Sequence, residues 1–195
     1  EHIVTDYQAD IAIIGAGLGG VAAALGALRS GRSVILTEEY EWIGGQMTSQ
    51  AVPSDEHSWI EHIGGSQSFR NLRTAIRQFY RDHYPLNEGA RNWQDLNPGS
   101  GWVSRMCVEP RVPLMVMEAW LAPYIGMGRL KLLKPYRPVS AETTGDRVTS
   151  VTLKHRQSGD QIAVSAAYII DATELGDLLP LTGTDYVKGF ESQSE

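Results

Sequence analysis

The feature that most constrains the fold is an apolar segment that runs directly into a cluster of four glycines near the N-terminus. Residues Asp10–Ile14 are followed by Gly15-Ala16-Gly17-Leu18-Gly19-Gly20. A continuous apolar run of this kind is typical of a parallel strand that is buried on both faces. After the glycines the apolar residues recur in steps of three and four, which predicts a helix. The expected buried face of that helix consists of Leu18, Val21, Ala22, Leu25 and Leu28.

A second strand is expected soon after this helix. Ser30-Gly31-Arg32 predicts the end of the helix, because glycine is favoured just past a last helical turn. Residues Ser33–Glu38 then predict the next strand. A strand, a helix and a strand within about 30 residues form a βαβ unit, which should cross over right-handed. The fold class that follows is α/β, with a Rossmann-like parallel sheet.

The spacing of the glycines has a physical cause in dinucleotide binding. Gly15 allows a sharp turn off the strand, and Gly17 lets the backbone approach a pyrophosphate without a Cβ in the way. Gly20 lets the helix pack closely on the strand. The amides of Leu18 and Gly19 belong to the first turn of the helix, where unpaired N–H groups and the helix dipole favour phosphate. A glycine-rich turn without a ligand is the alternative, and the strand and helix around the motif disfavour it.

An acidic residue ends the second strand, where dinucleotide-binding units hold the adenosine ribose. Glu38 is the expected ligand of the ribose hydroxyls, and Glu39 is the alternative. A carboxylate at this position repels a 2′-phosphate, so NADP is disfavoured.

The rest of the chain predicts a helical insertion followed by β structure. Residues 42–66 are expected to form a long loop, 67–82 a helix, 84–104 an irregular stretch, 110–125 a helix and 130–133 a short strand. Residues 137–143, 147–155 and 161–166 alternate apolar and polar residues around turn sequences, which predicts a three-stranded antiparallel meander. Tyr168–Asp171 is expected to be a further buried strand that leads into Ala172-Thr173-Glu174-Leu175-Gly176-Asp177.

Composition excludes several classes of protein. The formal net charge is −6 and no basic cluster stands out, which disfavours a nucleic-acid partner. No apolar run approaches the roughly 20 residues of a membrane span. The single cysteine, Cys107, excludes an internal disulfide and a cysteine-rich metal site, and no metal is expected. We expect a cytoplasmic protein, and an exported form stays open.

The βαβ unit alone does not choose between FAD and NAD, but a resemblance does. The chain resembles the FAD-dependent oxidoreductase family of bacterial proteins, related to the succinate dehydrogenase and fumarate reductase flavoproteins, whose FAD domain is of the glutathione-reductase type. The resemblance is carried by the glycine motif and Glu38, the meander, and the segments Trp42–Ala51, Ser104–Arg111 and Asp171–Asp177. It implies an FAD cofactor. Relatives that bind flavin covalently can carry a histidine where Gln46 stands, so non-covalent FAD is expected.

The resemblance also implies where the cofactor lies. Three loops should meet at the carboxyl ends of the parallel strands. The expected cofactor-binding residues are Gly15, Gly17, Leu18, Gly19, Gly20, Glu38, Glu39, Gly44, Gly45, Gln46, Ala172, Thr173 and Asp177. Asp177 has two interpretations, a ligand of a ribityl hydroxyl or a cap of the next helical turn. Relatives often have glycine where Glu174 stands, so the geometry of this loop is expected to differ.

Length limits what this chain is expected to do alone. Relatives are much longer, so residues 1–195 are interpreted as an FAD-binding domain from a longer protein, with a 42–128 insertion and a 137–166 meander. The expected partner is the C-terminal part of that protein, without which FAD should bind weakly or not at all.

Two functions follow from this interpretation. The first is a redox enzyme that oxidises or reduces a small organic substrate, which the sequence does not identify, through the flavin. The alternative is a non-catalytic cofactor-binding or partner-binding subunit. Arg105 and His57 are the catalytic candidates. The competing interpretation for His57 is a surface or interfacial histidine, and for Arg105 it is an Arg–Glu pair that braces the helix starting near Pro110.

Overall fold

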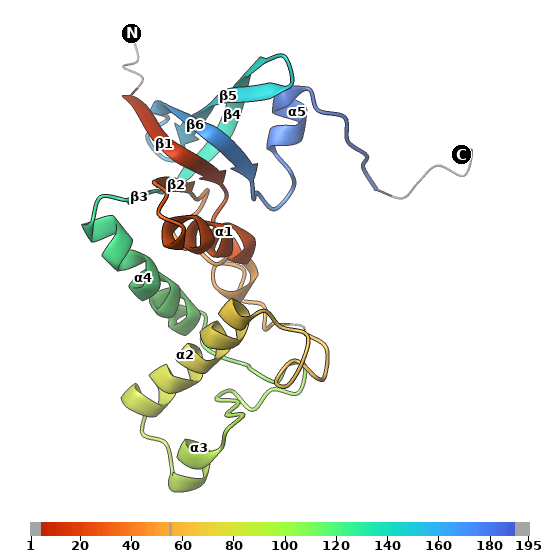
Figure 1. Ribbon diagram of the computed structural model, residues 1–195. Helices are drawn as coiled ribbons and strands as arrows, with labels where there is room; N and C mark the ends of the chain where they lie inside the picture. Colours follow the sequence, from red (N-terminus) through yellow and green to blue (C-terminus); the bar gives the residue numbers. More distant parts are fainter. Residues whose placement is uncertain (1–4, 55, 190–195) are drawn as a thin grey trace.

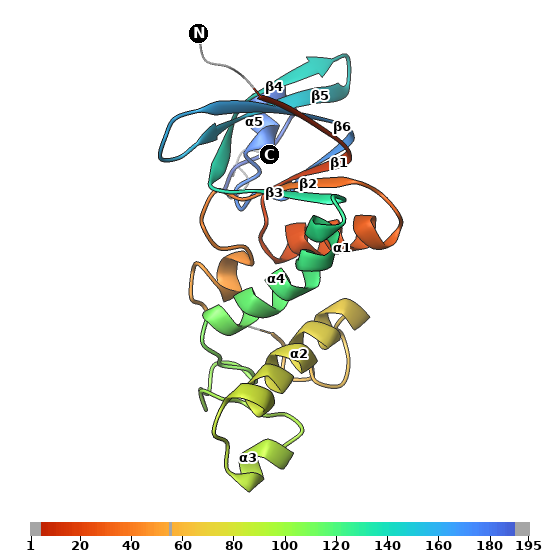
Figure 2. The same cartoon turned by 90° about the vertical axis from the view of Figure 1, so that its left-hand side faces the viewer.

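The computed structural model describes residues 5–54 and 56–189, which form a sheet-containing part and an elongated helical part (Figures 1 and 2). The sheet has six strands in the order β3-β2-β1-β6-β5-β4. Their bounds are β1 Thr5–Ile14, β2 Val34–Thr37, β3 Leu130–Leu133, β4 Tyr136–Thr144, β5 Arg147–His155 and β6 Gln161–Asp171. The pairs β3–β2, β2–β1 and β1–β6 are parallel, and β6–β5 and β5–β4 are antiparallel. The predicted α/β fold with a parallel sheet and a meander is confirmed.

One strand differs from the sequence prediction. Residues 161–166 and Tyr168–Asp171 are a single strand, β6, because nothing between them breaks the extended backbone. Its first half pairs with β5, and nearly its whole length pairs with β1. The expectation that Tyr168–Asp171 is buried is wrong, because Tyr168 is 73% exposed and Ile170 36% exposed.

The two faces of the sheet carry different cores. Helix α1, Leu18–Arg29, covers the face that holds Ile13 and Leu36. On the opposite face, Ala12 and Ile14 pack with residues of β5 and β6 and with Leu178 of the short helix α5, Leu178–Thr182. The apolar periodicity of α1 is mostly confirmed, although Ala24 is buried and Ala22 is exposed.

The connection from β2 to β3 contains the other helices. It holds the 3-10 turn η1 (Gly45–Met47) and the helices α2 (Gln67–His83), α3 (Glu88–Asn92) and α4 (Arg111–Gly126). Figure 2 shows α4 between the sheet and α2, which lies farther from the sheet. The stretch 84–104 is not wholly irregular as expected, since the Asn87 side chain accepts a hydrogen bond from the Ala90 N–H and starts α3.

Candidate functional site

The glycine loop joins β1 to α1 at the carboxyl end of the parallel strands. Gly15 has a φ of 100°, a conformation that side chains other than glycine rarely adopt. A Cβ at Gly15 would collide with the carbonyl group of Ala172, and a Cβ at Gly20 would collide with the carbonyl oxygen of Gly15. These two contacts give Gly15 and Gly20 the roles that the spacing predicts, a sharp turn and a close approach of helix to strand.

Glu38 supports this loop from the end of β2. Its Oε2 accepts the Ala16 N–H at 3.0 Å, and its Oε1 accepts the Tyr40 N–H at 3.0 Å. The residue is only 7% exposed. Burial raises the pKa of the Glu38 carboxyl above its ordinary value, against the lowering effect of the backbone N–H groups around it. Each carboxylate oxygen retains a second lone-pair site, so the group can also accept a ribose hydroxyl.

The second loop, after β2, is held against the first. The Gly44 N–H donates to the Ala16 carbonyl at 2.7 Å, and Gly44 and Gly45 have φ values of 101° and 52°. A Cβ at Gly45 would lie 3.3 Å from the Gly17 Cα. The backbones of Gly17 and Gly45, from two different loops, therefore lie close together, with Glu174 Oε1 2.7 Å from the position that a Cβ at Gly45 would take.

The third loop follows β6 and is organised by Asp171. Its carboxylate accepts the Thr173 N–H at 3.0 Å, the Thr173 hydroxyl at 2.7 Å and the Leu178 N–H at 2.9 Å. Asp177 makes no side-chain cap, so the capping interpretation of that residue is wrong and Asp171 takes that place. The ribityl role of Asp177 stays a prediction.

A pocket of about 520 Å³ lies where these three loops meet. Among the expected residues, those that line it are Gly15, Gly17, Glu38, Glu39, Gly45, Ala172, Thr173 and Asp177. Leu18, Gly19, Gly20, Gly44 and Gln46 do not line it. The side chain of Gln46 is exposed, while Gly20 and Gly44 are buried in the packing around the loops.

Sequence reasoning missed one wall of the pocket. Tyr136 and Pro138 of β4 line it together with Tyr40. The Tyr136 N–H donates to the Glu38 carbonyl at 2.8 Å, which ties the start of the meander to the end of β2. The Arg156 guanidinium lies 4.7 Å from the centroid of the Tyr40 ring and pairs with Glu39 at 2.8 Å. The meander could have indicated this wall. A strand that directly follows the parallel strand β3 must begin at the carboxyl edge of the sheet, which is where the pocket lies.

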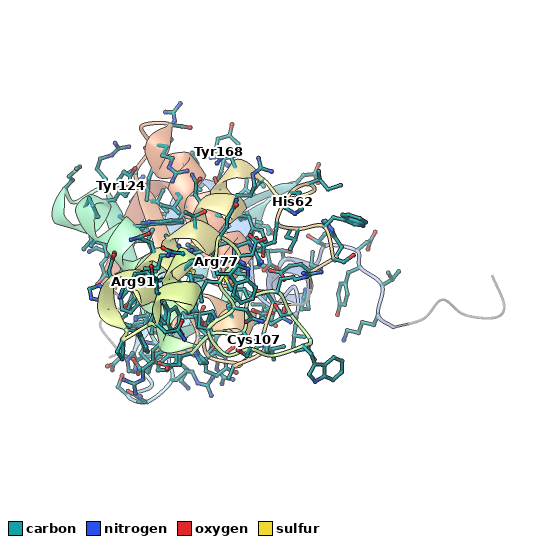
Figure 3. All side chains as sticks on the ribbon, turned by 90° about the horizontal axis from the view of Figure 1, so that it is seen from below. His62, Arg77, Arg91, Cys107, Tyr124 and Tyr168 are labelled. Carbon is teal, nitrogen blue, oxygen red and sulfur yellow. The ribbon has the colours of Figure 1, made fainter. Side chains whose placement is uncertain are left out.

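The two catalytic candidates are not brought to this pocket. His57 is exposed, and its Nδ1 accepts the Trp59 N–H at 3.1 Å in the loop before α2. Arg105 is also exposed, in the segment before α4. Figure 3 labels Arg77 and Cys107 in this helical part, with His62 on the loop at its side. Catalytic roles for His57 and Arg105 receive no support from this arrangement.

Within residues 5–54 and 56–189, no group of His, Cys, Asp and Glu side chains could hold a metal ion. Over the same residues, no helix has the length and apolar character required to cross a membrane.

The pocket and the first turn of α1 beside it fit a dinucleotide in two respects. The glycine backbones at Gly17 and Gly45 leave a gap that a Cβ on either residue would narrow. The N–H groups of Leu18 and Gly19 have no hydrogen-bond partner within the described parts of the chain, and helix N-termini favour phosphate groups. Gly17, the N-cap of α1, offers no side chain that would compete for these groups.

Comparisons with known proteins assign the chain to a family. The family model "FAD dependent oxidoreductase" matches residues 10–195. No curated protein matches the sequence significantly.

Solved structures show the same fold at low sequence identity. The Mycobacterium smegmatis Sdh1 complex in the apo form matches with a TM-score of 0.53 and 13% identity, over 87% of this chain and 35% of that one. The E. coli quinol fumarate reductase FrdA matches with a TM-score of 0.51 and 13% identity, over 87% and 33%. AlpK matches with a TM-score of 0.51 and 16% identity, over 90% and 33%.

This chain spans about a third of the length of these three structures. The family model, in contrast, covers nearly all of this chain. The chain belongs to the FAD dependent oxidoreductase family.

Proposed function

We propose that the protein carrying this chain is an FAD-dependent oxidoreductase, and that this chain holds the adenosine and pyrophosphate half of the cofactor non-covalently. The observation that carries the proposal is the meeting of the Gly15–Gly20 loop, Glu38 and the Gly45 backbone around one pocket. Bound FAD supplies the redox chemistry, by accepting or donating a hydride or electrons. This chain's residues bind and orient the cofactor.

Each loop has a separate part in the proposed site. The first turn of α1 and the gap between Gly17 and Gly45 receive the pyrophosphate. Glu38 accepts the ribose hydroxyls, and Tyr40, Tyr136 and Pro138 form the wall beside the adenosine. Thr173 and Asp177 also line the pocket, and in this proposal they face the ribityl chain of the cofactor.

The exposed face of β6 supports a further partner. Tyr168 and Ile170 pair in register with Ile11 and Ile13 and so lie on the face that α1 covers, yet α1 does not reach them. Parallel sheets are covered on both faces in α/β proteins. We propose that the C-terminal remainder of the same protein covers Tyr168 and Ile170 and completes the flavin site.

Anaerobic bleaching of the flavin tests the proposed activity. The longer protein that contains this chain is expected to carry FAD released by mild denaturation, and a small organic substrate should bleach its visible absorbance without oxygen. The 195-residue chain alone should bind FAD at least about tenfold more weakly, since the ring contacts are absent. FAD that stays oxidised across a broad panel of alcohols, amines and carboxylates would contradict the oxidoreductase proposal and favour a cofactor-holding subunit.

A further inference from the structure

The Glu174 carboxylate occupies the gap between the two facing glycine loops. A Cβ at Gly17 would lie 3.0 Å from Glu174 Oε1, and a Cβ at Gly45 would lie 2.7 Å from the same oxygen. The residue also lines the cofactor pocket. A carboxylate oxygen from the third loop therefore stands against the backbones of both glycines at once.

We call this gap the phosphate seat and define it by Gly17, Gly45 and the first turn of α1. The phosphate seat favours an anion. The positive end of the α1 dipole points into it, and the N–H groups of Leu18 and Gly19 lack partners within residues 5–54 and 56–189. A negative oxygen held here gains the same electrostatic attraction as a phosphate oxygen. Glu174 Oε1 lies against the two glycines of the seat, but among the described residues it accepts no hydrogen bond from Leu18 or Gly19.

A pyrophosphate and the Glu174 carboxylate cannot share the seat. Both are anions, and two like charges a few ångströms apart in a partly enclosed pocket repel strongly. Burial is the main cause of the raised pKa of Glu38, and the negative charge of Glu174 adds to it. Glu174 is exposed, and its side chain makes no hydrogen bond to any residue that the structure describes, so it is free to turn out toward solvent.

We propose that Glu174 competes with the cofactor pyrophosphate for the phosphate seat and so lowers the affinity of the site for dinucleotides. The side chain must leave the seat before the phosphates enter, and the energy of that displacement is subtracted from the binding energy. The adenosine part of the pocket is expected to change little, because Glu38, Tyr40 and Tyr136 lie on other elements and burial, rather than Glu174, is the main cause of the raised pKa of Glu38. This inference rests on the proposed cofactor site.

Calorimetric titration with ADP and with adenosine separates the seat from the rest of the pocket. ADP carries the pyrophosphate and adenosine lacks it, and neither requires contacts to the flavin ring. The Glu174→Gln variant keeps the size of the side chain and removes its charge. Its ADP dissociation constant is expected to fall about tenfold relative to the unaltered chain, because the anionic competitor is gone, while the adenosine constant stays within about twofold.

A charge-matched control guards against a general effect of net charge. Asp146→Asn also removes one negative charge, in the exposed turn between β4 and β5, and should leave both constants unchanged. The gain from Glu174→Gln should also shrink as salt is raised, which a purely structural effect would not do.

The outcomes distinguish this inference from the proposal on which it rests. Equal or weaker ADP binding by Glu174→Gln, with binding intact in the unaltered chain, overturns the role of Glu174 alone. Absence of ADP binding in the unaltered chain and in both variants contradicts the cofactor site itself, and this inference with it.

Discussion

Replacing Gly20 with alanine is expected to lower the free energy of unfolding by roughly 3 kcal/mol. The added Cβ would collide with the Gly15 carbonyl oxygen and lie 3.4 Å from the Ala172 Cβ. Both neighbours are fixed by other contacts, since the Gly15 N–H donates to Thr37 and the Ala172 N–H donates to Ile14. The helix must therefore move away from the sheet, which also displaces the amides that are proposed to face the phosphates. Chemical denaturation of the two proteins measures the difference.

Gly26 provides the matched control on the same helix. It is exposed, and a Cβ there would meet no atom within 4 Å. Gly26→Ala is expected to raise the free energy of unfolding by about 0.5–1 kcal/mol, because alanine is the better helix former. If Gly20→Ala and Gly26→Ala had the same effect, the close approach of α1 to the glycine loop would be refuted.

Removing the charge of Glu61 is expected to destabilise the helical part by about 3–5 kcal/mol. Arg73 and Arg77 of α2 are both buried, and Glu61 accepts hydrogen bonds from both, with Arg77 at 2.6 and 2.8 Å. Arg73 also pairs with Glu56. In Glu61→Gln, Arg73 would keep Glu56 as a carboxylate partner, while Arg77 would lose the carboxylate with which it pairs, and a poorly compensated buried charge is costly. Fluorescence of Trp59, Trp93 and Trp102, which lie in this part, follows its unfolding.

The surface pair between Lys134 and Glu118 supplies the comparison. It spans 3.5 Å, and the Glu118 side chain is 43% exposed. Glu118→Gln should cost less than about 1 kcal/mol, as is usual for exposed ion pairs. A cost for Glu61→Gln no larger than that for Glu118→Gln would mean that the buried network does not stabilise α2.

The same network predicts a dependence of stability on pH. Burial alone would raise the pKa of Glu61, but hydrogen bonds from Arg77 and Arg73 outweigh it and lower the pKa from 4.5 to about 2. A lowered carboxyl pKa gives stability that is complete above the unfolded value and is lost as pH falls from about 4.5 through about 2. Glu61→Gln should lose this part of the acid transition.

Much of the cofactor half of the fold could be predicted from the sequence because its signals are local. The change from an apolar run to helical periodicity at Gly15–Gly20 identifies β1 and α1, and the turn residues near Gly145 and Gly159 identify the meander. The strand Leu130–Leu133 was predicted with its observed bounds. Glu38 was placed correctly at the carboxyl end of β2, although its role as ribose ligand stays a prediction.

The rest of the fold and of the candidate site depends on contacts between distant segments, which the apolar periodicity of the sequence does not indicate. Arg73 is buried through its pairs with Glu56 and Glu61, which lie in a loop without periodicity. The exposure of Tyr168 depends on what covers β6 rather than on its own apolar neighbours. The position of Glu174 between Gly17 and Gly45 requires three loops to meet in space.

The most direct test of the cofactor site is an NMR titration of the ¹⁵N-labelled chain with ADP. We expect saturable shifts that are largest for the amides of Gly17, Leu18 and Gly19, with smaller shifts at Glu38 and Gly45 on the other loops of the pocket. Residues of α2 and α3 should not shift. Shifts confined to the helical part, or none at millimolar ADP, would contradict the assignment of the Gly15–Gly20 loop as the pyrophosphate site.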